Sequence, residues 1–127
     1  QQLGVLQIVA KGERRFRILT RHVQHDGLAR AEVEMLSEEA DAAIPERLLA
    51  CRTLLERLLA EHGERIFAHP MRLDSSVWVS ARLAEVLPLP TAAKQQLLEL
   101  DDGLQRLEIL QRLLVESARG PRSSEQF

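Results

Sequence analysis

Residues 82–102 read RLAEVLPLPTAAKQQLLELDD, and this stretch contains the end of one predicted helix and the whole of the next. The apolar run in its first half must stop at Pro88 and Pro90, because each proline disfavours helical backbone in the residue before it. Thr91 then stands where an N-cap is expected for a short helix over residues 92–100. The stretch therefore predicts a sharp corner between two helices that pack together.

Helical periodicity extends on both sides of this corner, through residues 37–118. A long amphipathic helix is expected over residues 45–62, with Pro45 in its first turn. The expected N-caps along the helical part are Ser37, Asp74 or Ser75, Thr91, and Asp101 or Asp102.

Apolar residues recur along these helices at spacings of three and four, which is the period of a helix packed on one face. They predict a bundle of four helices around one core, with Arg106, Glu108 and Arg112 facing water. The expected core residues are Leu48, Cys51, Leu55, Leu58 and His62; Val77, Trp78, Ala81, Leu83 and Ala84; Leu97, Leu98 and Leu100; and Leu104, Leu107, Leu110, Leu113 and Leu114.

Before residue 37 the apolar period is two, which is typical of strands. We expect three antiparallel strands, over residues 5–10, 15–20 and 28–36. Between the last two, Asp26-Gly27 predicts a hairpin with a type I′ turn. A sheet of three strands is thin and needs further strands or a helix to cover it.

The alternation assigns a face to the residues of the last two strands. Phe16 and Ile18 share one face, whereas Arg15 and Arg17 lie on the other. Together with Lys11 and Arg14, these arginines form the one basic cluster of the sequence. Acidic residues at 32 and 34 can pair with it across the hairpin, so a solvated strand face is favoured over a phosphate-binding surface.

These patterns predict an α+β fold in which antiparallel strands precede a helical bundle. We expect a β part over residues 1–36, a helical subdomain over residues 37–118 and a flexible tail over residues 119–127. A chain of 127 residues is long enough to bury a core without disulfides.

Composition restricts the class of function. A net charge of −2 and an aromatic content of 3% argue against a nucleic-acid partner, because neither a basic surface nor a stacking platform is supplied. No apolar stretch is long enough to span a membrane. The single cysteine fits a reducing cytosol, where we expect the protein to reside.

Residues that could carry chemistry do not form a recognisable constellation. The histidines have no metal-ligand spacing, Cys51 lies on an apolar helix face, and the serines near residue 75 lack a nucleophile elbow or a Gly-rich phosphate loop. We therefore predict no catalytic residue, no metal, no cofactor and no enzyme activity. The residue types that could fill such roles occur at His22, His25, His62, His69, Cys51, Ser75, Ser76 and Ser80.

Two blocks of the sequence resemble the N-terminal domain of Lon protease. The first is GERRFRI at residues 12–18 with AEVE at residues 31–34, which is similar to the last strands of that domain. The second and more specific is RLAEVLPL at residues 82–89, followed by Lys94-Gln95-x-Leu97-Leu98-Glu99, Asp101 and Arg106-Leu107-Glu108-x-Leu110. The resemblance covers nearly all of residues 3–115, and the short, stand-alone bacterial members are the nearest in kind.

This resemblance implies a PUA-like β-barrel followed by a helical bundle. The barrel would be partial, because the segments that the family carries in its first strands are expected before residue 1. The resemblance also implies recognition of protein substrates without chemistry, since the ATPase and protease modules of full Lon would lie beyond residue 118. An N-domain fragment of a full Lon protease remains an alternative.

The leading hypothesis is a non-catalytic module that binds unfolded or partner protein segments through an apolar surface between the strands and the helices. A PUA-like RNA-binding domain is the alternative, and the long Leu-rich helix could also be the seam of a homodimer. The residues expected at the peptide-binding surface are Phe16, Ile18, Val33, Met35 and Trp78.

Overall fold

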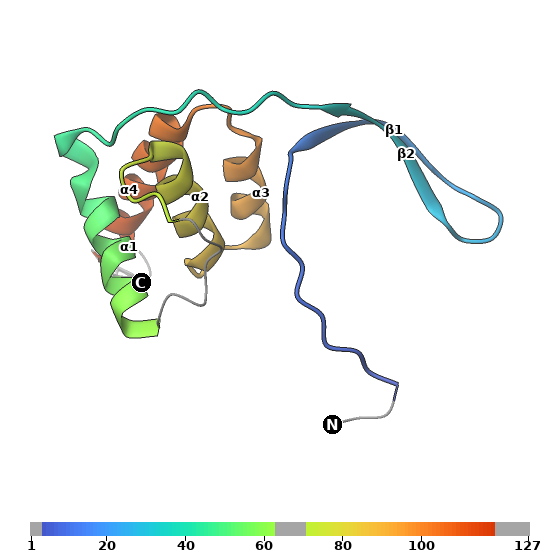
Figure 1. Cartoon of the computed structure of the whole chain (residues 1–127), viewed down its shortest axis with the longest axis horizontal. Helices are drawn as coiled ribbons and strands as arrows, with labels where there is room; N and C mark the ends of the chain where they lie inside the picture. The colour runs from blue at the N-terminus through green and yellow to red at the C-terminus, as the bar shows by residue number, and fades with distance from the viewer. Residues whose placement is uncertain (1–3, 63–70, 119–127) are drawn as a thin grey trace, which may run out of the picture. The chain divides into compact units, whose positions relative to one another are not determined.

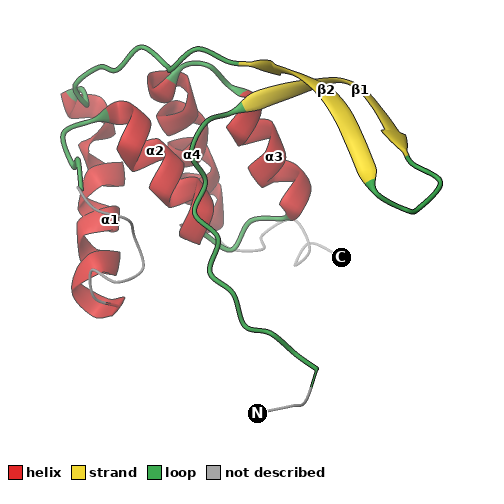
Figure 2. Cartoon of the chain, turned by 45° about the vertical axis from the view of Figure 1, so that its right-hand side comes forward, coloured by secondary structure: helices red, strands yellow, loops and turns green. Residues whose placement is uncertain are grey.

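The computed structural model describes residues 4–62 and 71–118 (Figure 1). Within these residues, a two-stranded antiparallel sheet is followed by four α-helices, in the α+β order that the sequence predicts (Figure 2). The contacts divide the chain into two units, Gln1–Glu38 and Glu39–Phe127. We call them the hairpin unit and the helical unit.

The sheet of the hairpin unit consists of β1 (Phe16–Val23) and β2 (Ala29–Met35). The hairpin turn lies where Asp26-Gly27 predicts it, and Asp26 accepts a hydrogen bond from the Leu28 N–H at 3.1 Å. The turn type differs from the expected I′. Gly27 has a φ of +91°, whereas no described residue other than glycine has a positive φ, so the second positive φ of a type I′ turn is missing.

The strand expected over residues 5–10 is not formed. These residues are exposed, and Val9 reaches 99% exposure. A period of two predicts which face a strand would bury, but a strand exists only where a neighbour completes its hydrogen-bond ladder. Within the described residues the sheet contains β1 and β2 alone.

The helical unit begins with an irregular connector that leads to a short 3₁₀ turn, η1 (Glu46–Leu48), and then to α1 (Leu49–His62). Pro45 is the N-cap of η1, close to its expected place. No helix begins at Ser37, so that expected cap is wrong. The connector instead runs to an isolated antiparallel bridge between Ala43 and Ser75.

The corner from residue 82 to residue 102 joins α2 (Ser76–Val86), α3 (Thr91–Glu99) and α4 (Gly103–Ala118). Two of the expected caps are confirmed: Ser75 accepts the N–H of Trp78, and Asp102 accepts the N–H of Leu104, each at 3.0 Å. Thr91 is the first helical residue and Pro90 the N-cap, so the cap expected at Thr91 is wrong.

Lys94 has a definite role at this corner. Its ammonium donates to the carbonyl of Glu85 at 2.8 Å, in the last turn of α2. Carbonyls at a helix C-terminus lack partners within the helix, and a lysine near them is favourable.

The core lies where the helices meet, and α2 crosses α4 closely. A Cβ at Gly103 would lie 2.8 Å from the backbone nitrogen of Val77, so the crossing requires glycine there. The buried apolar residues are Leu48, Cys51, Leu55, Leu59, Val79, Leu83, Leu97, Leu107 and Leu110.

The observed core also contains Leu59 and Val79, which are not among the expected core residues, and three further expectations are wrong. Leu98 is 52% exposed, and the side chain of His62 is 60% exposed. Arg106, expected to face water, is only 2% exposed. Charge partners supplied from distant parts of the chain explain the burial of Arg106, as shown below.

Candidate protein-binding surface

Four of the five residues predicted at the binding surface form one face of the hairpin. Phe16 pairs with Met35, and Ile18 pairs with Val33. Residues paired across antiparallel strands point to the same side, so the four side chains make a continuous apolar face. They are exposed in the hairpin unit, by 53% for Phe16, 51% for Ile18, 42% for Val33 and 47% for Met35.

The opposite face of the hairpin is polar and internally paired. Arg17 lies across from Glu34, and its guanidinium contacts that carboxylate at 3.2 Å. Arg14 in the same basic cluster donates to the carbonyl of Leu36 at 3.5 Å. The predicted pairing of this cluster with the partner strand is therefore confirmed for Arg17.

The apolar face changes character beyond an irregularity in β1. The pairing register shifts between Ile18 and Thr20, and Arg21 then pairs with Ala31. Because Ala31 lies two residues before Val33 on a regular strand, Arg21 lies on the same side as the apolar four. One cation thus borders the apolar face toward the turn.

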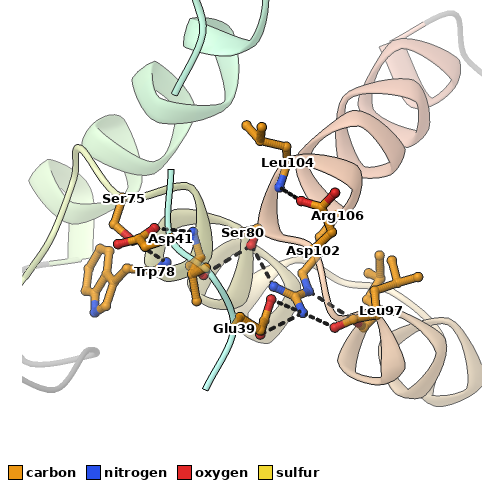
Figure 3. Close-up of polar contacts among 11 residues, drawn as sticks. Glu39, Asp41, Ser75, Trp78, Ser80, Leu97, Asp102, Leu104 and Arg106 are labelled. Carbon is orange, nitrogen blue, oxygen red and sulfur yellow. Dashed lines mark hydrogen bonds and ion pairs between the residues drawn. The ribbon is translucent and has the colours of Figure 1, made fainter. Parts of the chain in front are cut away.

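Trp78, the fifth predicted residue, belongs to the helical unit. It is half-buried in α2, and the guanidinium of Arg82 lies 5.9 Å from its ring centroid. Its backbone N–H donates to Ser75 (Figure 3). The described contacts thus bring four of the five predicted residues together within one unit, and Trp78 lies in the other.

The residues weighed for metal or acid–base roles lie apart. His22 is opposite Arg30 on the sheet, His25 is in the turn region, and His62 ends α1 beside Glu61 at 4.0 Å. His69 lies outside the described residues. Across residues 4–62 and 71–118, no three side chains of His, Cys, Asp or Glu gather as a metal site would require.

Cys51 and the serines have structural roles in the helical unit. Burial raises the pKa of the Cys51 thiol, which is fully buried, so it holds little thiolate. The Ser75 hydroxyl donates to Asp41 at 2.8 Å while it caps α2. The Ser80 hydroxyl donates to the carbonyl of Val77 at 3.1 Å.

The buried guanidinium of Arg106 is a feature that the sequence pattern missed (Figure 3). It donates to the carbonyls of Leu97 at 2.9 Å and Leu100 at 2.6 Å, and to the hydroxyl of Ser80 at 2.9 Å. It also forms an ion pair with Glu39 at 3.0 Å. One side chain therefore joins α2, the end of α3, α4 and the connector.

None of the described helices is both long enough and apolar enough to cross a bilayer.

The chain is similar to known proteins in sequence and in structure. The family model described as "ATP-dependent protease La (LON) substrate-binding domain" matches residues 1–116. No curated protein matches the chain. Among solved structures, a Lon N-terminal domain protein from Xanthomonas campestris is similar at 34% identity, with a TM-score of 0.66. The match covers 80% of this chain and 53% of that one, so the chain spans about half the length of that protein.

Proposed function

Since the chain belongs to the LON substrate-binding domain family, we propose that it is a non-catalytic module that binds segments of other proteins. The description of the family gives the class of function, and we propose that this chain has a function of the same class. The segments expected to bind are extended and apolar, as unfolded proteins or partner proteins expose them.

The observation that carries the proposal is the apolar face of the hairpin. Phe16, Ile18, Val33 and Met35 lie side by side in two cross-strand pairs, and each exposes about half of its surface within the hairpin unit. Contiguous apolar surface of this kind is unfavourable in water and is a common mark of interaction sites.

The same face suggests the chemistry of the ligand. Alternate side chains of an extended segment point to one side, so a segment with apolar residues at every second position could pack against the two cross-strand pairs. Arg21 borders this face, and an acidic residue at one end of the segment would lie near its charge. Apolar segments with an acidic flank are therefore the expected ligands.

The proposal is tested with the full chain and a fluorescently labelled, permanently unfolded protein, whose binding is followed by fluorescence anisotropy. Replacing Phe16 and Val33 together by serine is expected to weaken the affinity by about tenfold or more, because buried aromatic and apolar anchors dominate binding energies. The matched control is Thr20→Ala, on the polar face of the same hairpin. This control should leave the affinity unchanged.

Trp78 offers a separate readout of its predicted role. It is the only tryptophan in the sequence, so changes in tryptophan emission on binding would report contact at the helical unit. Binding without a change in emission would confine the surface to the hairpin and remove Trp78 from it.

Two outcomes would contradict the proposal. One is the absence of binding to any unfolded protein or apolar peptide. The other is binding that the double serine variant leaves intact. If RNA bound instead, with an affinity that falls with salt and is lost in Arg15→Glu, the nucleic-acid alternative would replace it.

A further inference from the structure

The connector at residues 39–44 is attached to the helical unit by a series of polar contacts. Glu39 pairs with Arg106, and Asp41 accepts the hydroxyl hydrogen of Ser75 (Figure 3). The carbonyl of Ala42 accepts the N–H of Ser76 at 2.9 Å. Residue 43 then forms the bridge to Ser75, and Ile44 is partly buried against the core.

The first of these contacts is an ion pair taken out of water. The side chains of Arg106 and Glu39 are 3% and 8% exposed. Three further hydrogen bonds of the guanidinium go to two carbonyls and one hydroxyl, and Glu39 supplies a carboxylate that balances its charge. Glu39 is also the first residue of the helical unit, so this ion pair holds the beginning of that unit on its helices.

The second contact places a carboxylate at the beginning of α2. Asp41 lies 3.4 Å from the N–H of Val77, and Arg72 lies 4.0 Å from its other oxygen. A negative charge at a helix N-terminus is favourable, because the N–H groups there carry partial positive charge. Two carboxylates, at positions 39 and 41, thus secure the connector on separate parts of the helical unit.

The balance of these forces suggests that the connector can separate from the helices while the helical core stays folded. It contributes one partly buried apolar side chain, Ile44, whereas the helical core behind it contains nine buried apolar residues among those that the structure describes. Removing one partner of a buried ion pair leaves an uncompensated charge, but separation of the connector returns both Glu39 and Arg106 to water together. Local openings of this kind require less free energy than global unfolding.

We propose that residues 39–44 form a latch, which opens and closes on the helical unit as one element while the helical core stays folded. When the latch opens, residues 39–44 detach from the helices of the helical unit, and this segment can span about 20 Å when extended. The existence of the latch does not depend on the function proposed above.

The test is native-state hydrogen exchange of the full chain, resolved by residue with NMR. Exchange of the Ser76 amide reports opening of the latch, because its acceptor is the carbonyl of Ala42. Exchange of the Val79 amide reports fraying of the first turn of α2, since it donates to the carbonyl of Ser75 at 3.0 Å. Exchange of the Leu110 amide, within α4, reports opening of the core. We expect Ser76 to exchange faster than both Val79 and Leu110.

Two variants test which contacts keep the latch closed. Glu39→Gln is expected to lower the protection of the Ser76 amide by about tenfold, since hydrogen bonds to charged groups are the stronger ones. Asp41→Asn provides a milder change, because the side chain of Asp41 is 41% exposed, and it keeps the test valid if Glu39→Gln fails to fold. The control is Glu108→Gln, which removes an exposed ion pair to Arg47 elsewhere on the helical unit.

Exchange of Ser76 at the same rate as Leu110 would show that the connector leaves only on global unfolding, and this would overturn the proposal. Exchange of Ser76 together with Val79 would assign the motion to fraying of α2 and would overturn it as well. Unchanged protection of Ser76 in both latch variants would have the same consequence.

Discussion

The two units of this chain differ in whether their apolar residues are buried or exposed. In the helical unit, leucines from α1, α2, α3 and α4 meet in a core from which water is excluded. In the hairpin unit, every residue of β1 and β2 is exposed, including Phe16, Ile18, Val33 and Met35. Both units contain amphipathic elements, but only the helical unit provides the second surface that such elements need.

This difference separates stability from recognition. Burial of apolar surface stabilises a fold, and a two-stranded hairpin alone is marginally stable in water. We therefore expect the helical unit to determine the free energy of unfolding of the chain and the hairpin unit to supply surface for a partner. Paired substitutions, one in each unit, test this division.

The largest difference is expected between the two arginine ion pairs. Arg106→Ala should lower the free energy of unfolding by about 3–5 kcal/mol, because it leaves Glu39 and two carbonyls without their buried partner. Arg17→Ala breaks an exposed pair with Glu34 and should cost less than about 1 kcal/mol. Urea denaturation followed by circular dichroism measures both. Equal effects would mean that the ion pair of Arg106 is accessible to water in solution.

A comparable contrast is expected for apolar side chains. Leu107→Ala removes a fully buried side chain and should cost about 2–5 kcal/mol. Ile18→Ala, at a position that is 51% exposed, should leave the unfolding of the helical unit within about 0.5 kcal/mol of the original. A large effect of Ile18→Ala in the same denaturation experiment would show that the hairpin face is buried in solution, for instance by a second copy of the chain.

Glycines extend the comparison to backbone packing. An alanine Cβ at Gly103 would lie 2.9 Å from the carbonyl carbon of Ser76, so Gly103→Ala must push α2 and α4 apart, at about 1–3 kcal/mol. Gly12→Ala in the hairpin unit meets nothing within 4 Å and should be neutral.

The reactivity of the buried Cys51 thiol measures how far Gly103→Ala loosens the helical core. Its rate of reaction with an aromatic disulfide should rise in Gly103→Ala and stay unchanged in Gly12→Ala, since labelling requires the helical core to open. Equal labelling rates in the two variants would contradict the close crossing of α2 and α4.

Sequence patterns predicted the parts of this structure that depend on neighbouring residues. Pro88 and Pro90 end α2 where expected, and Ser75 caps its start, because these effects act over a few positions. The alternation of Phe16 and Ile18 with arginines gave the correct faces of the hairpin. The helical and strand periods therefore sufficed for the fold class and for placing the four hairpin residues on one face, whereas their role in binding stays a prediction.

Features that depend on distant partners could not be read from the sequence in this way. Arg106 counts as polar in any helical period, and its burial depends on Glu39, 67 residues away in the chain. The strand expected over residues 5–10 failed for the related reason that a period of two does not supply a ladder partner.

The smallest expected effect is the dependence of the helical unit on Asp41 at acid pH. Partial desolvation tends to raise the pKa of this carboxyl group. The hydrogen bonds from Ser75, Val77 and Ala42, together with the charge of Arg72, outweigh it, so the pKa lies below its ordinary value of 3.8. A carboxylate whose pKa is lower in the folded state stabilises that state above the unfolded pKa, and this contribution is lost as the pH falls through the folded pKa.

Below about pH 4, the unfolding free energy of the original chain should therefore fall more steeply than that of Asp41→Asn. Denaturation at a series of pH values compares the two, with Glu34→Gln in the hairpin unit as the control that should follow the original. Parallel profiles for the original chain and Asp41→Asn would show that the contacts of Asp41 with α2 add nothing to the stability of the helical unit.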